Sequence, residues 1–170
     1  MKNLSKILIL LIACQFGCSQ DDDGDIVENG GSFTIDGTSY DLSKGFLVDE
    51  GGEYDIILTS AGISLESDAG DDFIGVGDYV SIIVISSSAT SFEPGTFTWN
   101  TNKAPGTIED IGVRVNFDFD TEIGDLDLDG TGGTATVTLS EDIYTVTFTI
   151  ATATETITGS FVGPLKDVQD

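Results

Sequence analysis

The sequence predicts an all-β domain built mainly from antiparallel strands. From Ser32 onward, short runs of apolar and β-branched residues are separated by Gly, Asp, Asn and Pro, which is typical of strands joined by turns. One stretch alternates strictly with a period of two, and no segment has the periodicity of an amphipathic helix. About eight or nine strands without strand–helix–strand units indicate an antiparallel β-sandwich, with a partly closed β-barrel as the alternative.

The first strands are expected in residues 33–85. Residues 33–35 and 38–40 flank Asp36-Gly37, a pair that supplies the positive φ angles of a type I′ turn, so they predict a tight hairpin. Residues 54–59 and 79–85 are more continuously apolar, as in strands that are covered on both faces. We therefore expect these two strands at the centre of the fold.

The second half of the domain predicts five more strands. A turn at Glu93-Pro94-Gly95 leads into residues 96–99, where Phe97 and Trp99 share one face. Residues 111–119 alternate apolar and polar side chains. Three further alternating segments, whose threonine faces indicate a solvated side, predict an antiparallel meander: residues 135–139, 144–150 and 157–161.

The N-terminus is typical of a signal peptide spanning residues 1–17. Lys2 and Lys6 provide the positive charge, and the apolar run 7–13 is too short for a membrane-spanning helix, which needs about 20 residues. The chain's only cysteines, Cys14 and Cys18, close this segment, an arrangement used in bacterial lipoprotein processing. We expect acylation at Cys18, with Cys14 as the alternative and a cleaved, unacylated secretory signal as a third reading.

The residues after Cys18 resemble a known export pattern. Ser19-Gln20-Asp21-Asp22-Asp23 is similar to the start of surface lipoproteins of the Bacteroidota, which carry an acidic tract after the acylated cysteine. The turn at residues 94–99 and the threonine-rich closing segment also resemble small Bacteroidota lipoproteins with β-sandwich domains. The resemblance implies a lipid-anchored protein on the outer face of the bacterial outer membrane. It implies no functional residues.

The chain divides into three parts. After the signal peptide, residues 18–31 are rich in acids and glycine and have little to bury, so they predict a flexible tether. Residues 32–170 form a single domain that is large enough for one core. The whole chain has a net charge of −24, and removing residues 1–17 leaves four basic and 30 acidic residues.

This composition excludes several functions. A nucleic-acid partner requires clustered Lys and Arg, and the chain has no such cluster. Because it contains no histidine, it cannot form a Ser-His-Asp or Cys-His relay. The membrane is expected as a partner through the lipid anchor alone.

One acidic motif makes Ca²⁺ a candidate cofactor. Asp125, Asp127 and Asp129, followed by Gly130, match the first half of an EF-hand loop. Thr136 stands where the bidentate Glu is expected, so a strand with an acidic, solvated side is the alternative. Asp68, Asp71 and Asp72 form a second acidic loop with the same two interpretations.

Aromatic side chains are the candidate ligand-binding residues. Exposed aromatics of β-domains bind glycans by stacking on sugar rings, and Trp99 and Tyr40 are the first candidates, followed by Tyr54 and Tyr79. Trp99 shares a face with Phe97, so a core role is its alternative. Tyr40 follows the hairpin turn, where exposure is expected.

These observations predict a non-catalytic binding module for an extracellular glycan or protein, anchored to the outer membrane by lipid. One alternative is a structural or accessory subunit of a surface assembly, joined through an exposed strand edge. The other is a carboxylate-dependent hydrolase, which requires a cleft with two acids, one of them with a raised pKa.

Overall fold

The computed structural model describes residues 29–66 and 72–169, in which all regular structure is β-strand. The predicted all-β class is confirmed. The predicted signal peptide, both candidate acylation sites, Cys18 and Cys14, most of the tether and the acids Asp68 and Asp71 lie outside the described residues. Within the described ranges, no helix is long and apolar enough to cross a membrane.

Thirteen strands are present in the described residues. Their bounds are β1 Gly30–Ile35, β2 Thr38–Leu42, β3 Lys44–Asp49, β4 Glu53–Thr59, β5 Ile63–Leu65, β6 Phe73–Ile85, β7 Thr96–Trp99, β8 Thr107–Asp118, β9 Leu126–Asp129, β10 Gly132–Ser140, β11 Ile143–Ala151, β12 Thr156–Gly163 and β13 Leu165–Gln169. The predicted count of eight or nine was therefore too low.

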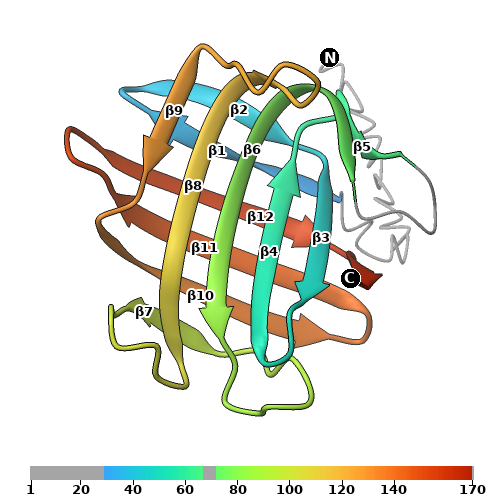
Figure 1. Cartoon of the computed structure of the whole chain (residues 1–170), viewed down its shortest axis with the longest axis vertical. Coiled ribbons are helices and arrows are strands. Elements are labelled where there is room, and N and C mark those ends of the chain that lie inside the picture. The colour runs from blue at the N-terminus through green and yellow to red at the C-terminus, as the bar shows by residue number, and fades with distance from the viewer. Residues whose placement is uncertain (1–28, 67–71, 170) are drawn as a thin grey trace, which may run out of the picture.

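One hydrogen-bonded path joins eleven strands in the order β13-β3-β4-β6-β8-β7-β10-β11-β12-β1-β2, while β5 pairs with β6 and β9 with β8. Figure 1 shows β3, β4, β6 and β8 in front of β10, β11 and β12 and running across them. The parallel pair β7–β8, with Thr98 opposite Thr107 and Trp99 opposite Ile108, joins the two halves. The sheet curls into a half-barrel, and the predicted sandwich of separate sheets is not confirmed.

The strands that the sequence did not predict are short or lie at the end of the path. β5 has three residues, and β3 and β13 mix apolar with charged side chains. β13 pairs with β3 in parallel, with Leu165 opposite Gly45 and Asp167 opposite Leu47. Side-chain alternation is a property of one strand, so a pairing between two strands that lie far apart in the chain cannot be predicted from it.

The predicted hairpin and meander are confirmed. β1 and β2 pair through a two-residue turn in which Asp36 and Gly37 have φ angles of 47° and 79°, as a type I′ turn requires. β10, β11 and β12 pair as consecutive antiparallel neighbours. On β11, Val146 and Phe148 are buried while Thr147 and Thr149 are exposed, so the threonine face is the solvated one.

The core fills the space between the two halves. The front half contributes inward side chains from β4, β6 and β8, and the back half from β7, β10, β11, β12 and β1. Residues with at most 4% exposure in this core include Ile56, Leu58, Val80, Ile82, Ile111, Val113, Phe97, Val137, Val146, Phe148, Ile157, Phe161 and Phe33.

The expectation that residues 54–59 and 79–85 are covered on both faces was wrong. β4 and β6 do lie inside the sheet, flanked by β3 and β8. However, buried and half-buried side chains alternate along them, so that Ile57 and Ile83 are half-buried on the outer face. Their continuous apolar character therefore reflects an outer face that keeps apolar side chains in partial contact with water.

Candidate functional site

Residues 126–129 of the acidic motif form strand β9, as its strand interpretation expects, and Asp125 directly precedes the strand. Asp127 Oδ1 lies 2.7 Å from Arg114 Nε, and Asp129 Oδ1 lies 3.1 Å from Arg114 Nη2. Asp125 accepts a hydrogen bond from Asn116 Nδ2 at 3.1 Å. Arg114 also donates to the main-chain oxygen of Leu128 at 3.0 Å, so these contacts fasten β9 to β8.

The carboxylates of this motif do not converge as in an EF-hand loop. Within the described residues, no group of three or more acidic, His or Cys side chains is arranged to hold a metal ion. Asp72 is the only acid of the second predicted loop that the structure describes.

The two aromatic residues predicted first as ligand contacts lie apart from the pockets described below. Tyr40 is half-buried, and its ring stacks on Phe33 with centroids 5.1 Å apart and planes inclined at 18°. Trp99, at the end of β7, is half-buried and packs against the core. Tyr54 and Tyr79, which were also candidates, each line a pocket.

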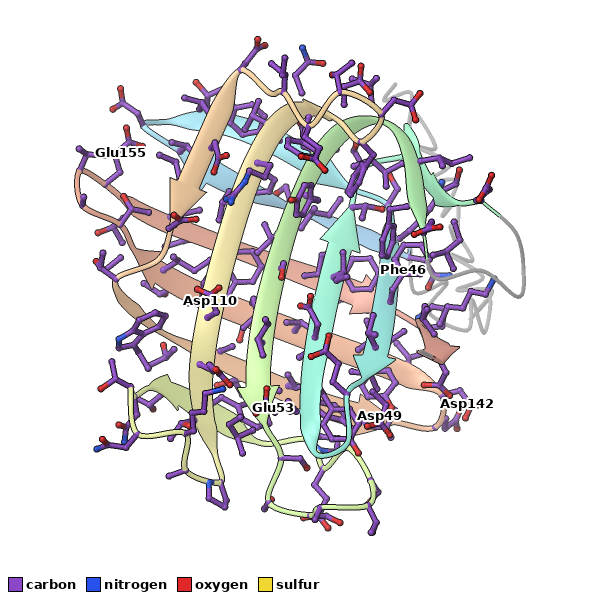
Figure 2. All side chains as sticks on the ribbon, viewed as in Figure 1. Phe46, Asp49, Glu53, Asp110, Asp142 and Glu155 are labelled. Carbon is purple, nitrogen blue, oxygen red and sulfur yellow. The ribbon has the colours of Figure 1, made fainter. Side chains whose placement is uncertain are left out.

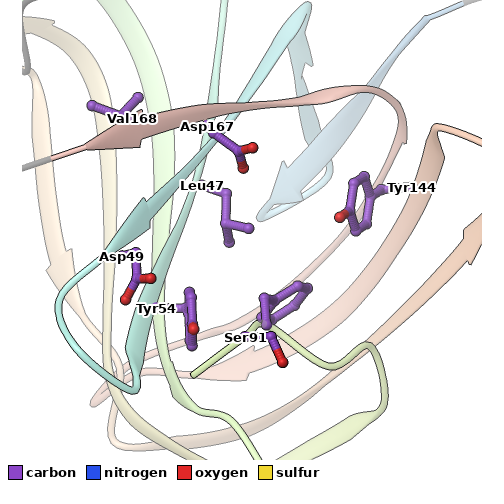
Figure 3. Close-up of a pocket in the computed structure, with 8 residues that line it drawn as sticks. Leu47, Asp49, Tyr54, Ser91, Tyr144, Asp167 and Val168 are labelled. Atoms are coloured by element: carbon purple, nitrogen blue, oxygen red, sulfur yellow. The ribbon is translucent and has the colours of Figure 1, made fainter. Parts of the chain in front are cut away.

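The Tyr54 pocket lies at one end of the half-barrel and has a volume of about 270 Å³. Figure 3 shows its side chains converging from strands β13, β3 and β4, from β11 and from the loop between β6 and β7. Its lining residues are Leu47 and Asp49 of β3, Tyr54 of β4, Ser91 and Phe92 of the loop, Tyr144 of β11, and Asp167 and Val168 of β13.

Burial divides the pocket into a base, walls and a rim. Leu47, Tyr54 and Val168 are buried at 6%, 2% and 5% exposure and form the base. Phe92 and Tyr144 are half-buried and form aromatic walls. The rim is polar and exposed, and it consists of Asp49, Ser91 and Asp167.

The Tyr54 hydroxyl is buried and makes no hydrogen bond of standard geometry in the part of the chain that the structure describes, while the Asp49 carboxylate lies close enough to interact with it. Burial, followed by the negative charge of Asp49 and by the side-chain contact with that carboxylate, raises the pKa of this phenol above its usual value of 10.0. The group therefore stays neutral at physiological pH and keeps its donor and acceptor capacity. An unpaired buried hydroxyl costs about 1–3 kcal/mol, so the fold tolerates this cost at the base of a pocket.

Three aromatic rings connect the walls to the base. The Phe92 centroid lies 5.4 Å from that of Tyr54 and 6.2 Å from that of Tyr144. Burial, followed by the negative charges of Asp167 and Asp142, raises the pKa of the Tyr144 phenol. Figure 2 places Asp49 and Asp142 toward the same end of the molecule. The pocket is aromatic inside and acidic at its opening.

Local hydrogen bonds position the loop that carries Ser91 and Phe92. Ser86, 4% exposed, donates from its hydroxyl to the Ser91 main-chain oxygen at 3.0 Å. The same hydroxyl accepts hydrogen bonds from the main-chain N–H groups of Glu93 at 3.1 Å and Ser88 at 3.3 Å. On the opposite rim, Asp49 Oδ1 accepts from the N–H of Gly51 at 2.8 Å.

A second pocket, of about 350 Å³, contains Tyr79, Arg114, Phe117, Phe119, Glu122 and Asp127. The Tyr79 ring lies 5.3 Å from Phe119 and 5.5 Å from Phe117, so the three aromatics pack on one another. Arg114 is already bonded to Asp127, Asp129 and Leu128. The charged groups of Arg114 and Asp127 in this pocket therefore bond to each other.

Asp55 has the raised pKa that a hydrolase acid would need, but it lies outside both pockets. Burial raises its pKa to about 6, and the Ser81 hydroxyl lies 2.9 and 3.0 Å from its two oxygens. Its neighbours Tyr54 and Ile56 are buried, so Asp55 projects from the outer face of β4. It lines neither pocket.

No known protein-family model, curated protein or solved structure matches this chain. Sequence reasoning had named Tyr54 but no other residue of its pocket. Asp49, Ser91, Tyr144 and Asp167 carry no motif, and Tyr144 occupied a regular position in a predicted strand. The available signal was the Ser-rich segment 86–91, which interrupts the alternation between two strands.

Proposed function

We propose that this chain is a lipid-anchored, non-catalytic binding module of the bacterial cell surface that binds a glycan in the Tyr54 pocket. The observation that carries the proposal is the buried Tyr54 hydroxyl, which makes no hydrogen bond of standard geometry in the described residues. Buried polar groups in folded proteins are nearly always hydrogen-bonded. A ligand hydroxyl that enters the pocket would supply the missing partner.

The composition of the pocket suits a sugar. A sugar ring has apolar C–H faces and a rim of hydroxyl groups. Phe92 and Tyr144 offer aromatic faces, while Asp49, Ser91 and Asp167 offer hydrogen-bonding groups at the rim. Polar groups make up most of the accessible lining of this pocket, as a ligand rich in hydroxyl groups requires.

The anchoring part of the proposal rests on the sequence. The apolar run 7–13, Cys18 shortly after it and the acidic tract 21–23 support acylation and export to the outer face of the outer membrane. A protein that carries more than one acyl chain is stably anchored in the membrane. A tether at residues 18–31 would hold the binding pocket away from the lipid surface.

A second candidate function is an accessory subunit that docks through a strand edge. β2 and β13 end the hydrogen-bonded path and each leave one edge without a strand neighbour in the described residues. Both strands have only five residues, and they carry Asp41, Lys166 and Asp167. Short, charged edges resist pairing with another chain, so this arrangement supports the proposal less well than the pocket does.

The binding claim is tested with the chain from residue 18 onward, carrying Cys18→Ser to prevent acylation. Saturation-transfer NMR with a panel of soluble oligosaccharides should detect binding that Tyr54→Phe and Tyr144→Phe weaken. Tyr40→Phe is the matched control, because Tyr40 stacks on Phe33 away from the pocket. Binding to no member of the panel, or binding that is indifferent to both pocket variants, would overturn the proposed function.

A separate experiment tests the anchor. Cells expressing the full chain are fed a radiolabelled fatty acid, and the label is expected in the intact protein and absent from Cys18→Ala. Label that disappears only in Cys14→Ala would move the acylation site to the alternative cysteine. If neither the intact protein nor any variant carries the label, lipid anchoring is contradicted.

A further inference from the structure

We propose that the ligand of the Tyr54 pocket carries a positively charged amine and that this ligand is an amino sugar. This inference rests on the proposed function and narrows it from glycans in general to one chemical class. It follows from the charge of the rim, the three aromatic rings and the Tyr54 hydroxyl, which makes no hydrogen bond of standard geometry in the described residues.

The charge of the pocket is negative and is not offset by its own lining. Asp49 and Asp167 lie on the rim, and none of the eight lining residues is basic. Asp142 adds a further negative charge that acts on Tyr144. An anionic ligand is therefore repelled, and a cation is attracted to the opening.

The basic side chains in the described residues do not line the Tyr54 pocket. Lys44 donates to the main-chain oxygens of Ala61 and Ile63, and Lys103 pairs with Glu53 and Glu109. Arg114 pairs with Asp127 and Asp129. Lys166 lines a different pocket, together with Lys44 and Phe46.

The interior of the pocket also favours a cation. Tyr54, Phe92 and Tyr144 line the pocket, and a cation within about 6 Å of an aromatic centroid is attracted by the ring quadrupole. An ammonium group has three N–H donors. The carboxylates of Asp49 and Asp167 and the hydroxyl oxygen of Tyr54 provide three acceptors among the lining residues.

Size and polarity distinguish the possible sources of the amine. A volume of about 270 Å³ lies just below the range of typical small-molecule sites, which suits a single ring. A lysine side chain would bring an apolar stem with no hydroxyl groups. Tyr54, Tyr144 and Ser91 supply three hydroxyls that a sugar can bond and a lysine stem cannot. The observations therefore favour an amino sugar over a basic peptide.

The test compares three probes by titration calorimetry at pH 7 and fixed ionic strength, using the chain from residue 18 onward with Cys18→Ser. The probes are the β-1,4 disaccharide of glucosamine, its N,N′-diacetyl form and lysine amide. We expect the free amino disaccharide to bind at least tenfold more tightly than the acetylated form. Asp49→Asn and Asp167→Asn should reduce that preference, whereas Asp41→Asn, on the exposed β2, should leave it unchanged.

Each other result has a defined meaning. Equal affinity for the amino and acetylated disaccharides would overturn the charged-amine inference and leave glycan binding intact. Lysine amide that binds as tightly as the amino disaccharide would overturn the assignment to a sugar. If neither disaccharide binds and the oligosaccharide panel is also negative, the proposed function itself fails.

Discussion

The rings of Tyr54 and Phe92 lie with their centroids 5.4 Å apart and their planes inclined at 57°. One belongs to strand β4 and the other to the loop between β6 and β7, so this contact joins the rigid sheet to the loop that closes the pocket. The geometry of the pocket therefore depends on how that loop is held.

Ser86→Ala should disorder this loop. The Ser86 hydroxyl, on a buried residue, makes hydrogen bonds to the main chain of Ser91, Glu93 and Ser88, and the substitution removes all three. We expect the free energy of unfolding to fall by about 1–3 kcal/mol in chemical denaturation. Ser87→Ala, at an exposed neighbouring position, should change it by less than about 0.5 kcal/mol. Equal effects of the two substitutions would contradict the assigned role of Ser86.

Asp55→Asn should stabilise the protein at pH 7. Because burial raises the pKa of Asp55 from 3.8 to about 6, the folded state holds a proton that the unfolded state releases above about pH 4. The free energy of unfolding therefore falls as the pH rises from about 4 to about 6, and it stays lowered above that range. Asp55→Asn should remove this slope and add about 3 kcal/mol at pH 7.

The check for Asp55 is a series of urea denaturations between pH 4 and pH 8. Asp41→Asn, on an exposed edge strand, serves as the control and should keep the slope. If Asp55→Asn retains the wild-type pH dependence, the buried environment of Asp55 has been assigned incorrectly.

Arg114 should contribute more to stability than either of its acidic partners. The Arg114 side chain is 17% exposed, whereas those of Asp127 and Asp129 are 61% and 79% exposed. Exposed ion pairs are each worth about 0.2–1 kcal/mol, so Asp129→Asn should have a small effect. Arg114→Met also loses the hydrogen bond to Leu128, and thermal melts should show a clearly larger decrease. The reverse order would contradict this account of how β9 is held.

Gly159→Ala should disrupt the back half of the sheet. Gly159 of β12 lies opposite Phe33 on one side and Phe148 on the other. An added Cβ would clash with the Phe148 ring and lie 2.8 Å from the Ser32 main-chain oxygen. Overpacking of this kind costs about 1–3 kcal/mol. Gly95→Ala, where a Cβ meets nothing within 4 Å, is the control in the same denaturation experiment and should be nearly neutral.

Local patterns predicted much of this fold. The type I′ hairpin at Asp36-Gly37 and the meander β10–β11–β12 depend on turn chemistry and side-chain alternation between consecutive strands, and both are confirmed. The parallel pairing of β13 with β3 and the curl of the sheet depend on contacts between distant residues. These could not be read from alternation, because alternation assigns a face to a side chain but assigns no neighbour to a strand.

The candidate site was less predictable for the same reason. Asp167 and Leu47 line one pocket because the parallel pair places them opposite each other, although they lie at opposite ends of the domain sequence. Tyr54 was a candidate as an aromatic residue, but its hydroxyl is distinguished only by the lack of a hydrogen bond of standard geometry in the described structure. Trp99 was a candidate as an aromatic residue, and it packs against the core, as the face that it shares with Phe97 offered as the alternative.

The most direct test of the central claim is the effect of Tyr54→Phe on stability and on binding together. A hydroxyl kept unpaired for a ligand should cost stability in its absence, so Tyr54→Phe should raise the free energy of unfolding by about 1–3 kcal/mol. The same change should weaken binding of the glucosamine disaccharide by about tenfold. Thr59→Val removes another buried hydroxyl without a partner in the described residues, away from the pocket, and should leave binding unchanged. A Tyr54→Phe variant that binds as tightly as the unmodified chain would contradict the account.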